Sequence, residues 1–202
     1  MAVMVGRLAD VYIASGTGTA MTGEATSSLG SGVYQITTAA RRAINPNAAI
    51  TVLDGASAVN PAYYRFAFGS GKVIFTNGYT PSGSVTIDGE YLTLSQAAQG
   101  QSWALEVETS TEESHTFGDE WKEQTSVMSE ASITFDRLYE DSYFQTNIGQ
   151  YYVLALYLNT STGARYVCAA QCESAGRTSS NSSLVRENAS FVVHGQLDYV
   201  AS

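Results

Sequence analysis

Only a few residue groups in this chain have the types and spacing that chemistry requires. His194 and Asp198 lie four residues apart near the end of the chain and, with a serine, would supply the side chains of a hydrolase triad. On a strand, however, residues four apart are separated by about 13 Å, too far for a direct hydrogen bond. Gly69-Ser70-Gly71 has the wrong spacing for a nucleophile elbow. The sequence therefore predicts no catalytic residues and a protein that is not an enzyme.

The acidic residues and the cysteines do not have the spacing of a metal site either. Seven carboxylates fall within residues 106–123, but they lack the alternating Asp/Asn pattern and the glycine of a calcium loop. His115, inside that run, is interpreted as a surface residue. Cys168 and Cys172 would lie about 13 Å apart on one strand, beyond the reach of a disulfide, and are predicted to be reduced core thiols. No cofactor or metal is expected.

The composition favours a protein with large subunit contacts. Only 14% of the 202 residues are charged, whereas a typical soluble domain has about 25%. The net charge of −9 excludes a broad basic field for nucleic acid. The longest apolar run, residues 151–158, is too short to span a membrane, and the N-terminus has no signal-peptide pattern. We therefore expect synthesis in the cytoplasm and no membrane partner.

The segments that carry these residues have the sequence pattern of β-strands. Short β-branched and aromatic runs alternate with Gly, Asp-Gly and Asn-Gly turn signals, which predicts about ten strands in an all-β sandwich or barrel. The chain is expected to form a single domain, 1–202. Three hairpins are predicted: 62–68 with 72–75, 85–87 with 90–94 across Asp88-Gly89, and 150–158 with 164–172.

Three segments depart from this strand pattern. Residues 15–32 are rich in Gly, Ser and Thr and are predicted to be an N-terminal arm or loop that becomes ordered against a partner. Residues 110–130 are predicted to be a long loop containing the chain's one short helix, 120–124, capped by Asp119. Residues 173–183 are predicted to be a polar loop.

Alternation along three strands predicts which side chains are buried. In 103–109, Trp103, Leu105 and Val107 are expected in the core, with Glu106 and Glu108 on the opposite face. The last strand is expected to bury Phe191, Val193, Leu197 and Tyr199 and to present His194, Gln196 and Asp198 on its other face. Residues 150–158 are apolar on both faces, so Tyr152 and Leu156 are expected in a central strand or under a subunit contact.

Three groups of segments, in order, resemble the tail tube proteins of phages with long non-contractile tails. They are YQITTAARR (34–42) with ITVLDG (50–55), GKVIF (71–75) with GSVTIDGEYL (83–92), and TFGDEWKE (116–123) with ASI (131–133). The resemblance implies a β-sandwich with a flanking helix and six copies closing a ring. Rings would stack into a virion tube through which double-stranded DNA passes without specific binding. The tape measure protein and the tail terminator would be further partners.

The resemblance gives the exposed charges possible roles. Nine Asp/Glu and one Lys fall in residues 73–123, and an acidic wall would repel DNA phosphates. We therefore expect Glu106, Glu108, Gln196 and Asp198 to line the lumen. We also expect Arg41 or Arg42 of one ring to approach acidic groups such as Glu112 and Glu113 of the next ring.

Two other classes of protein are compatible with this composition. A capsid decoration or head–tail joining protein would share the β-rich, weakly charged profile but would need no lumen. A carbohydrate-binding, adhesin-like module would need exposed aromatic side chains, which Tyr63, Tyr64, Tyr151 and Tyr152 could supply. Packing of these tyrosines within strands or interfaces is the simpler interpretation.

Overall fold

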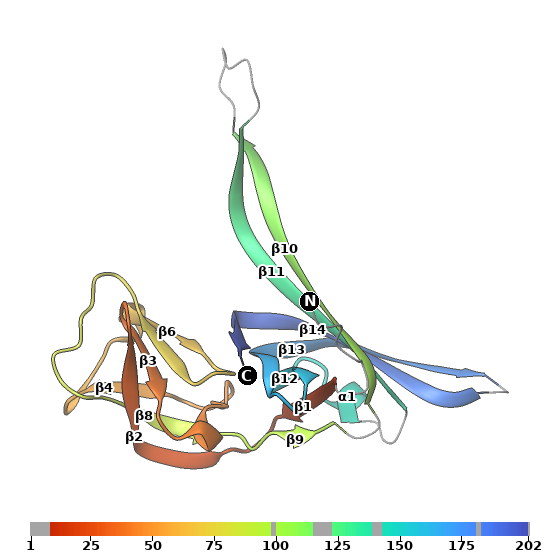
Figure 1. Cartoon of the computed structure of the whole chain (residues 1–202), viewed down its shortest axis with the longest axis horizontal. Helices are drawn as coiled ribbons and strands as arrows, with labels where there is room; N and C mark the ends of the chain where they lie inside the picture. The colour runs from red at the N-terminus through yellow and green to blue at the C-terminus, as the bar shows by residue number, and fades with distance from the viewer. Residues whose placement is uncertain (1–8, 98–99, 115–122, 139–142, 181–182, 202) are drawn as a thin grey trace.

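The computed structural model describes residues 9–97, 100–114, 123–138, 143–180 and 183–201, and it places them in two seven-stranded antiparallel sheets (Figure 1). The first sheet has the order β10-β11-β14-β13-β12-β1-β9, and the second has the order β5-β4-β8-β2-β3-β7-β6. The first sheet contains β1 (Asp10–Ala14), β9 (Ser95–Gln96), β10 (Gly100–Ser114), β11 (Glu123–Leu138), β12 (Tyr151–Asn159), β13 (Ala164–Ser180) and β14 (Ser183–Val200). The second contains β2 (Thr19–Gly30), β3 (Val33–Ile36), β4 (Thr51–Asp54), β5 (Ser57–Ala58), β6 (Tyr64–Ala67), β7 (Lys72–Phe75) and β8 (Val85–Tyr91). The predicted all-β class is confirmed.

The core of the first sheet lies around β12, which pairs with β1 on one side and β13 on the other. Tyr152 and Leu156 are both fully buried within the chain, as are the three residues between them. The helix α1 (Tyr143–Thr146) inserts Phe144 between the rings of Phe135 and Phe191, at centroid distances of 6.1 and 5.7 Å. A short flanking helix therefore exists after β11. Of the helix expected at 120–124, Glu123 and Gln124 belong to β11, and residues 120–122 lie outside the described part of the chain.

The second sheet has a separate core. Ile36, Ile44, Val52, Val73 and Ile87 are all fully buried there. The hairpin predicted at 62–75 is confirmed as β6–β7, and the hairpin at 150–172 is confirmed as β12–β13. Each sheet thus buries its own apolar face, and the contact between the sheets is a separate structural feature.

Two predictions for the second sheet are wrong. Residues 19–30 form β2, which pairs with β8 and β3, so most of the expected N-terminal loop is a strand. The expected turn at Asp88-Gly89 is the middle of β8, where Gly89 pairs with Met21. In both places a neighbouring strand supplies the ladder hydrogen bonds, and these outweigh weak local β-propensity.

The two predicted polar loops are in fact long hairpins. β10 and β11 pair as far as Ser114 and Glu123, where a loop and helix were expected, and residues 115–122 lie outside the described part of the chain. β13 and β14 pair as far as Ser180 and Ser183, where the loop 173–183 was expected. Figure 1 shows both hairpins leaving the body of the chain as two-stranded ribbons. A two-stranded ribbon that leaves the body of the chain needs no hydrophobic alternation, so the strand signal is absent from its sequence.

Candidate functional site

The first projecting ribbon, the β10–β11 arm, begins at Glu106 and continues to Glu130 on the return strand. At its base Trp103 and Leu105 pack against the core of the first sheet, as alternation predicted. Val107 was also expected in the core, but 60% of its side chain is exposed because the strand has already left the body at that point. Among the described residues β10 pairs only with β11, so its outer edge is open.

This arm carries much of the chain's negative charge. Residues 106–130 include eight of the nineteen Asp/Glu residues and a single basic residue, Lys122. Glu106 and Glu108 are exposed near the base of the arm, on the face opposite Trp103 and Leu105. The backbone positions of Glu112 and Glu113 belong to β10, while their side chains lie outside the described part of the chain.

The second ribbon, the β13–β14 arm, has a different chemistry. Residues 173–188 contain two Asp/Glu and two Lys/Arg residues, so the arm has no net charge. Near its tip Leu184 and Val185 are 69% and 39% exposed. Large apolar side chains in this position cover nothing in the isolated chain, which is typical of a surface that contacts a partner.

A buried ion pair anchors the second arm to the body. Arg137 of β11 donates from Nε to Oε2 of Glu187 at 2.7 Å, and its Nη2 lies 2.6 Å from the same oxygen. The Arg137 guanidinium also lies over the ring of Phe144, 4.5 Å from its centroid. Both partners of the pair are almost fully buried. Removal of either partner would leave an uncompensated charge in the core.

Asp198 does not lie on an exposed face. It is 6% exposed and accepts hydrogen bonds from Ser70, from Lys72 Nζ at 3.1 Å and from Gln196 Nε2 at 2.9 Å. The lumen prediction for Asp198 is therefore wrong. Asp198 still lies on the face of β14 opposite the core, because its partner Val167 and the partner of His194, Ala169, share one face of β13. At Asp198 this face is covered by the second sheet, through Ser70 in the turn between β6 and β7 and Lys72 of β7.

The neighbours of Asp198 on β14 are exposed. Gln196 is solvent-accessible, so its place in the lumen stays a prediction. Tyr199, which was expected in the core, is 55% exposed, and its ring lies against that of Tyr166, with 5.3 Å between the ring centroids. The ring of His194 lies 5.0 Å from that of Tyr151, and it makes no triad with Asp198, which bonds to Ser70 and Lys72 instead.

The two arginines expected at a ring contact are not equivalent. Arg41 forms an ion pair with the buried carboxylate of Glu24 and lies over the ring of Tyr91. Burial alone would raise the pKa of Glu24, but hydrogen bonds from Thr38 and Arg41, together with the charge of Arg41, lower this pKa below its usual value. Arg42 donates from Nε to the carbonyl of Ile36 at 2.9 Å and has no carboxylate partner among the described residues. Arg42 is thus the better-placed residue for an external contact.

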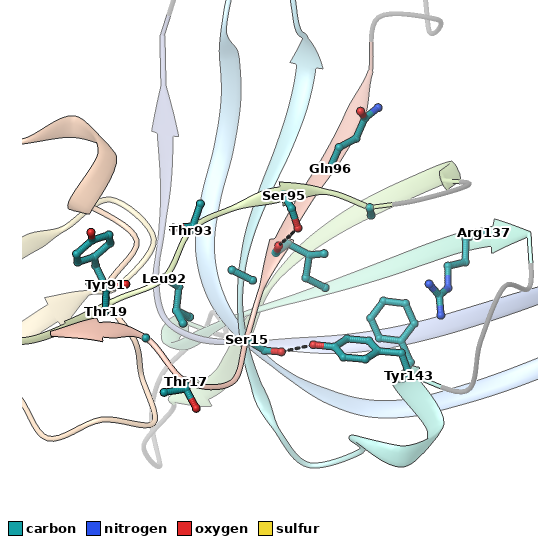
Figure 2. Close-up of a pocket in the computed structure, with 15 residues that line it drawn as sticks. Ser15, Thr17, Thr19, Tyr91, Leu92, Thr93, Ser95, Gln96, Arg137 and Tyr143 are labelled. Atoms are coloured by element: carbon teal, nitrogen blue, oxygen red, sulfur yellow. Dashed lines mark hydrogen bonds between the residues drawn. The ribbon is translucent and has the colours of Figure 1, made fainter.

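Two hollows lie beside the junction of the sheets. Figure 2 shows the first, about 450 Å³, lined mainly by hydroxyl and apolar groups from β1, β9 and α1. The hydroxyl of Ser15 bonds to that of Tyr143, and none of the lining residues is a His, Cys or carboxylate that could activate it. The hollow therefore has no arrangement for nucleophilic catalysis.

The second hollow, about 500 Å³, was not found from the sequence. Its lining includes Arg42, Lys72 and Arg165, which are far apart along the chain and are brought together only by the contact between the sheets. That contact is close, since a Cβ on Gly69 would lie 2.5 Å from the backbone nitrogen of Cys168. No sequence motif could have predicted this cluster.

The remaining chemical groups are accounted for by packing. Cys168 and Cys172 are buried and free on β13, as predicted, and burial raises the pKa of the Cys168 thiol to about 12.

In the described part of the chain, no group of three or more His, Cys, Asp or Glu side chains could hold a metal ion. Among the described helices, none is long and apolar enough to cross a bilayer. Tyr152 is buried and Tyr63 stacks on Tyr79, so the tyrosines form no common exposed platform.

Neither a family model nor a curated protein matches this chain. Solved structures do match. A chain from the virion of a native gene transfer agent (GTA) particle is 13% identical, with a TM-score of 0.44 over 54% of this chain and 89% of that chain. A chain from the tail of an empty GTA particle with C6 symmetry is 14% identical, with a TM-score of 0.44 over 54% and 87%.

Proposed function

We propose that this chain is a structural subunit that assembles with its own copies into rings, which stack to form the tube of a phage tail. The two projecting arms carry this proposal. An isolated two-stranded ribbon is at best marginally stable in water, because it has no face to bury. β10 spans about 30 Å between Glu106 and Ser114 at the rise of a strand. Arms of this length, one of them tipped with exposed Leu184, are stabilised when they lie on other subunits.

The first sheet offers a route to ring closure. Its two ends differ, with the fifteen-residue edge of β10 at one end and β1 with the short β9 at the other. Open strand edges favour pairing with another chain. A contact between two different surfaces of neighbouring copies is head-to-tail. Such contacts give a closed ring when the rotation from one subunit to the next is a whole fraction of a full turn. Six copies per ring is the number implied by the resemblance to tail tube proteins.

The function of the tube would be passive. Genomic DNA would pass along its axis, with Glu106, Glu108 and Gln196 on the wall as groups that do not bind phosphate. The tape measure protein and the tail terminator would contact the lumen and the last ring. The subunit needs no catalytic group, cofactor or metal for this role. Its site of action would be the virion, after synthesis in the host cytoplasm.

Electron microscopy of the purified chain tests the proposal. We expect rings or tubes with a central hole. In a variant whose residues 109–129 are replaced by a two-residue Asn-Gly turn that joins the paired residues Glu108 and Glu130, the fold should remain and tubes should be lost. A wild-type chain that stays monodisperse at high concentration, with or without phage tail extract, would exclude the tube. Particles that bind capsids instead would favour a decoration protein.

A further inference from the structure

The second hollow has a basic lining. Three of the ten Lys/Arg residues of this acidic protein line it, from three separate segments, and no carboxylate is among its lining residues. Lys72 is partly neutralised by Asp198 behind it, at 3.1 Å. Arg42 and Arg165 have no carboxylate partner among the described residues. Two arginines that share one concave surface without counter-ions favour an acidic ligand.

The two arginines are already held in position by neutral groups. Arg42 donates to backbone carbonyls of the 36–37 segment, at 2.9 Å for Ile36. Arg165 donates to the carbonyl of Gly163 at 2.9 Å, and its guanidinium lies 5.3 Å from the ring centroid of Tyr157. These contacts restrict the side chains but leave their charge uncompensated. An anionic partner would therefore meet preorganised donors and lose less side-chain entropy on binding.

The rim of the hollow is apolar. Leu29, at the tip of β2, and Tyr199, near the end of β14, line the hollow and are each 55% exposed. Exposed large apolar side chains around a hollow are typical of a surface that contacts a protein partner. The hollow lies between the two sheets, where the β6–β7 turn meets β13 and β14.

We propose that this hollow receives the acidic β10–β11 arm of a neighbouring copy, so that carboxylates of the arm neutralise Arg42 and Arg165. The inference rests on the proposed function and specifies its ring-to-ring contact. Charge complementarity selects the occupant, because residues 106–130 carry eight carboxylates and one lysine, whereas the other arm is neutral. Figure 1 shows the arm pointing away from the body that bears the hollow, so the arm that enters belongs to another copy.

Each docking contact would be weak, but the six equivalent contacts of a ring would together be strong. A loss of about two-fold in affinity at each contact, as for an exposed ion pair, would multiply to roughly sixty-fold over six equivalent contacts in a ring. The contact should also weaken with salt, because the Debye length falls from about 10 Å at 0.1 M to about 3 Å at 1 M. Tubes are thus expected to shorten with rising salt while single rings persist.

The test compares tube lengths of variants by electron microscopy at several salt concentrations. We expect Arg42→Gln with Arg165→Gln to form rings that stack at least ten-fold less, while Arg65→Gln, an exposed arginine on β6 outside the hollow, stacks normally. Arg42→Lys with Arg165→Lys should retain most of the stacking. Thermal unfolding of each variant excludes a general loss of fold, and a destabilised Gln variant is replaced by Arg165→Gln alone.

A charge exchange makes the test specific. Arg165→Glu should abolish stacking, and adding Glu112→Arg with Glu113→Arg to the same chain should restore it. Restoration would support the docking, because a merely structural role of Arg165 would not be rescued from the arm. Normal tubes in the Gln double variant, or no rescue by the exchange, would overturn this inference and leave the tail tube proposal intact. Absence of tubes in the wild-type chain would overturn both.

Discussion

The two arms have the same architecture but differ in charge and in exposed apolar residues. Each is a two-stranded antiparallel ribbon that leaves the first sheet, yet the β10–β11 arm is strongly acidic and the β13–β14 arm is neutral, with Leu184 and Val185 exposed. Their anchors differ as well, since among the described residues a buried ion pair is found at the base of the second arm and not of the first. The difference indicates two kinds of contact. The acidic arm would select its partner by charge, and the neutral arm would contribute contact area with little dependence on salt.

The largest expected effect is at the anchor of the neutral arm. Arg137→Leu leaves the Glu187 carboxylate buried without its partner, which should reduce the free energy of unfolding by about 3–5 kcal/mol. Urea unfolding measures this loss. Arg186→Leu, an exposed position one residue before Glu187, is the matched control and should change the free energy by less than about 0.5 kcal/mol. A loss below about 1 kcal/mol for Arg137→Leu would contradict the assigned role of the pair.

The second effect separates assembly from folding on the neutral arm. Leu184→Asp places a charge where we expect an apolar contact with another subunit, and it should weaken that contact by about 1–2 kcal/mol without changing the thermal midpoint. Sedimentation velocity reports the loss of large assemblies. Ile148→Asp is the control, because Ile148 is also half exposed but lies outside both arms. Equal assembly of the two variants would show that the neutral arm makes no such contact.

A third, smaller effect concerns the base of the acidic arm. Glu106→Lys with Glu108→Lys leaves the packed Trp103 and Leu105 untouched, so rings and tubes should still form. On the lumen hypothesis, DNA passage through the tube should slow several-fold and recover in part at higher salt, because lysines would bind phosphates. Fluorescent DNA-release kinetics from particles provide the measurement. Release at the normal rate, or a tube map with both residues outside, would exclude the lumen assignment.

The smallest effect lies outside both arms and distinguishes Arg41 from Arg42. The pKa of Glu24 is lowered in the folded chain, so its ion pair with Arg41 stabilises the fold above the unfolded value and is lost as the pH falls through the folded value. Below about pH 4.5 the thermal midpoint of Arg41→Gln should therefore decrease less steeply with falling pH than the midpoint of the wild-type chain. At pH 7 its midpoint should change by less than about 4 °C. If Arg41→Gln also shortened tubes as strongly as the loss of Arg42, the two arginines would share a role.

Sequence reasoning predicted the regular parts of this fold well. The all-β class, the β6–β7 and β12–β13 hairpins and the central position of residues 150–158 all follow from local alternation and turn residues. The arms were missed because their sequences lack the period-two hydrophobic pattern on which strand prediction depends, as is expected of ribbons that project from the body. β2 was missed because its first part pairs with β8, which is distant in sequence, although its last part forms a hairpin with β3, which follows it directly.

The candidate site was less predictable than the fold. The exposure of Glu106 and Glu108 followed from alternation, whereas the burial of Asp198 depends on contacts with Ser70 and Lys72, which are 128 and 126 residues away in the sequence. The cluster of Arg42, Lys72 and Arg165 exists only because the two sheets meet. Contacts between separate cores have no sequence period, and so they can be found only in three dimensions.

The open edge of β10 has a consequence for the subunit before it assembles. A long unpaired edge invites two monomers to pair with each other, which would give a symmetric dead-end dimer or an aggregate. Here the edge carries Glu106, Glu108, Glu112 and Glu113, so pairing one β10 with another would bring like charges together. This repulsion would keep newly made subunits dispersed in the crowded cell. Growth would then start only where a preformed ring presents a different edge, so nucleation, and not subunit supply, would set when a tube begins.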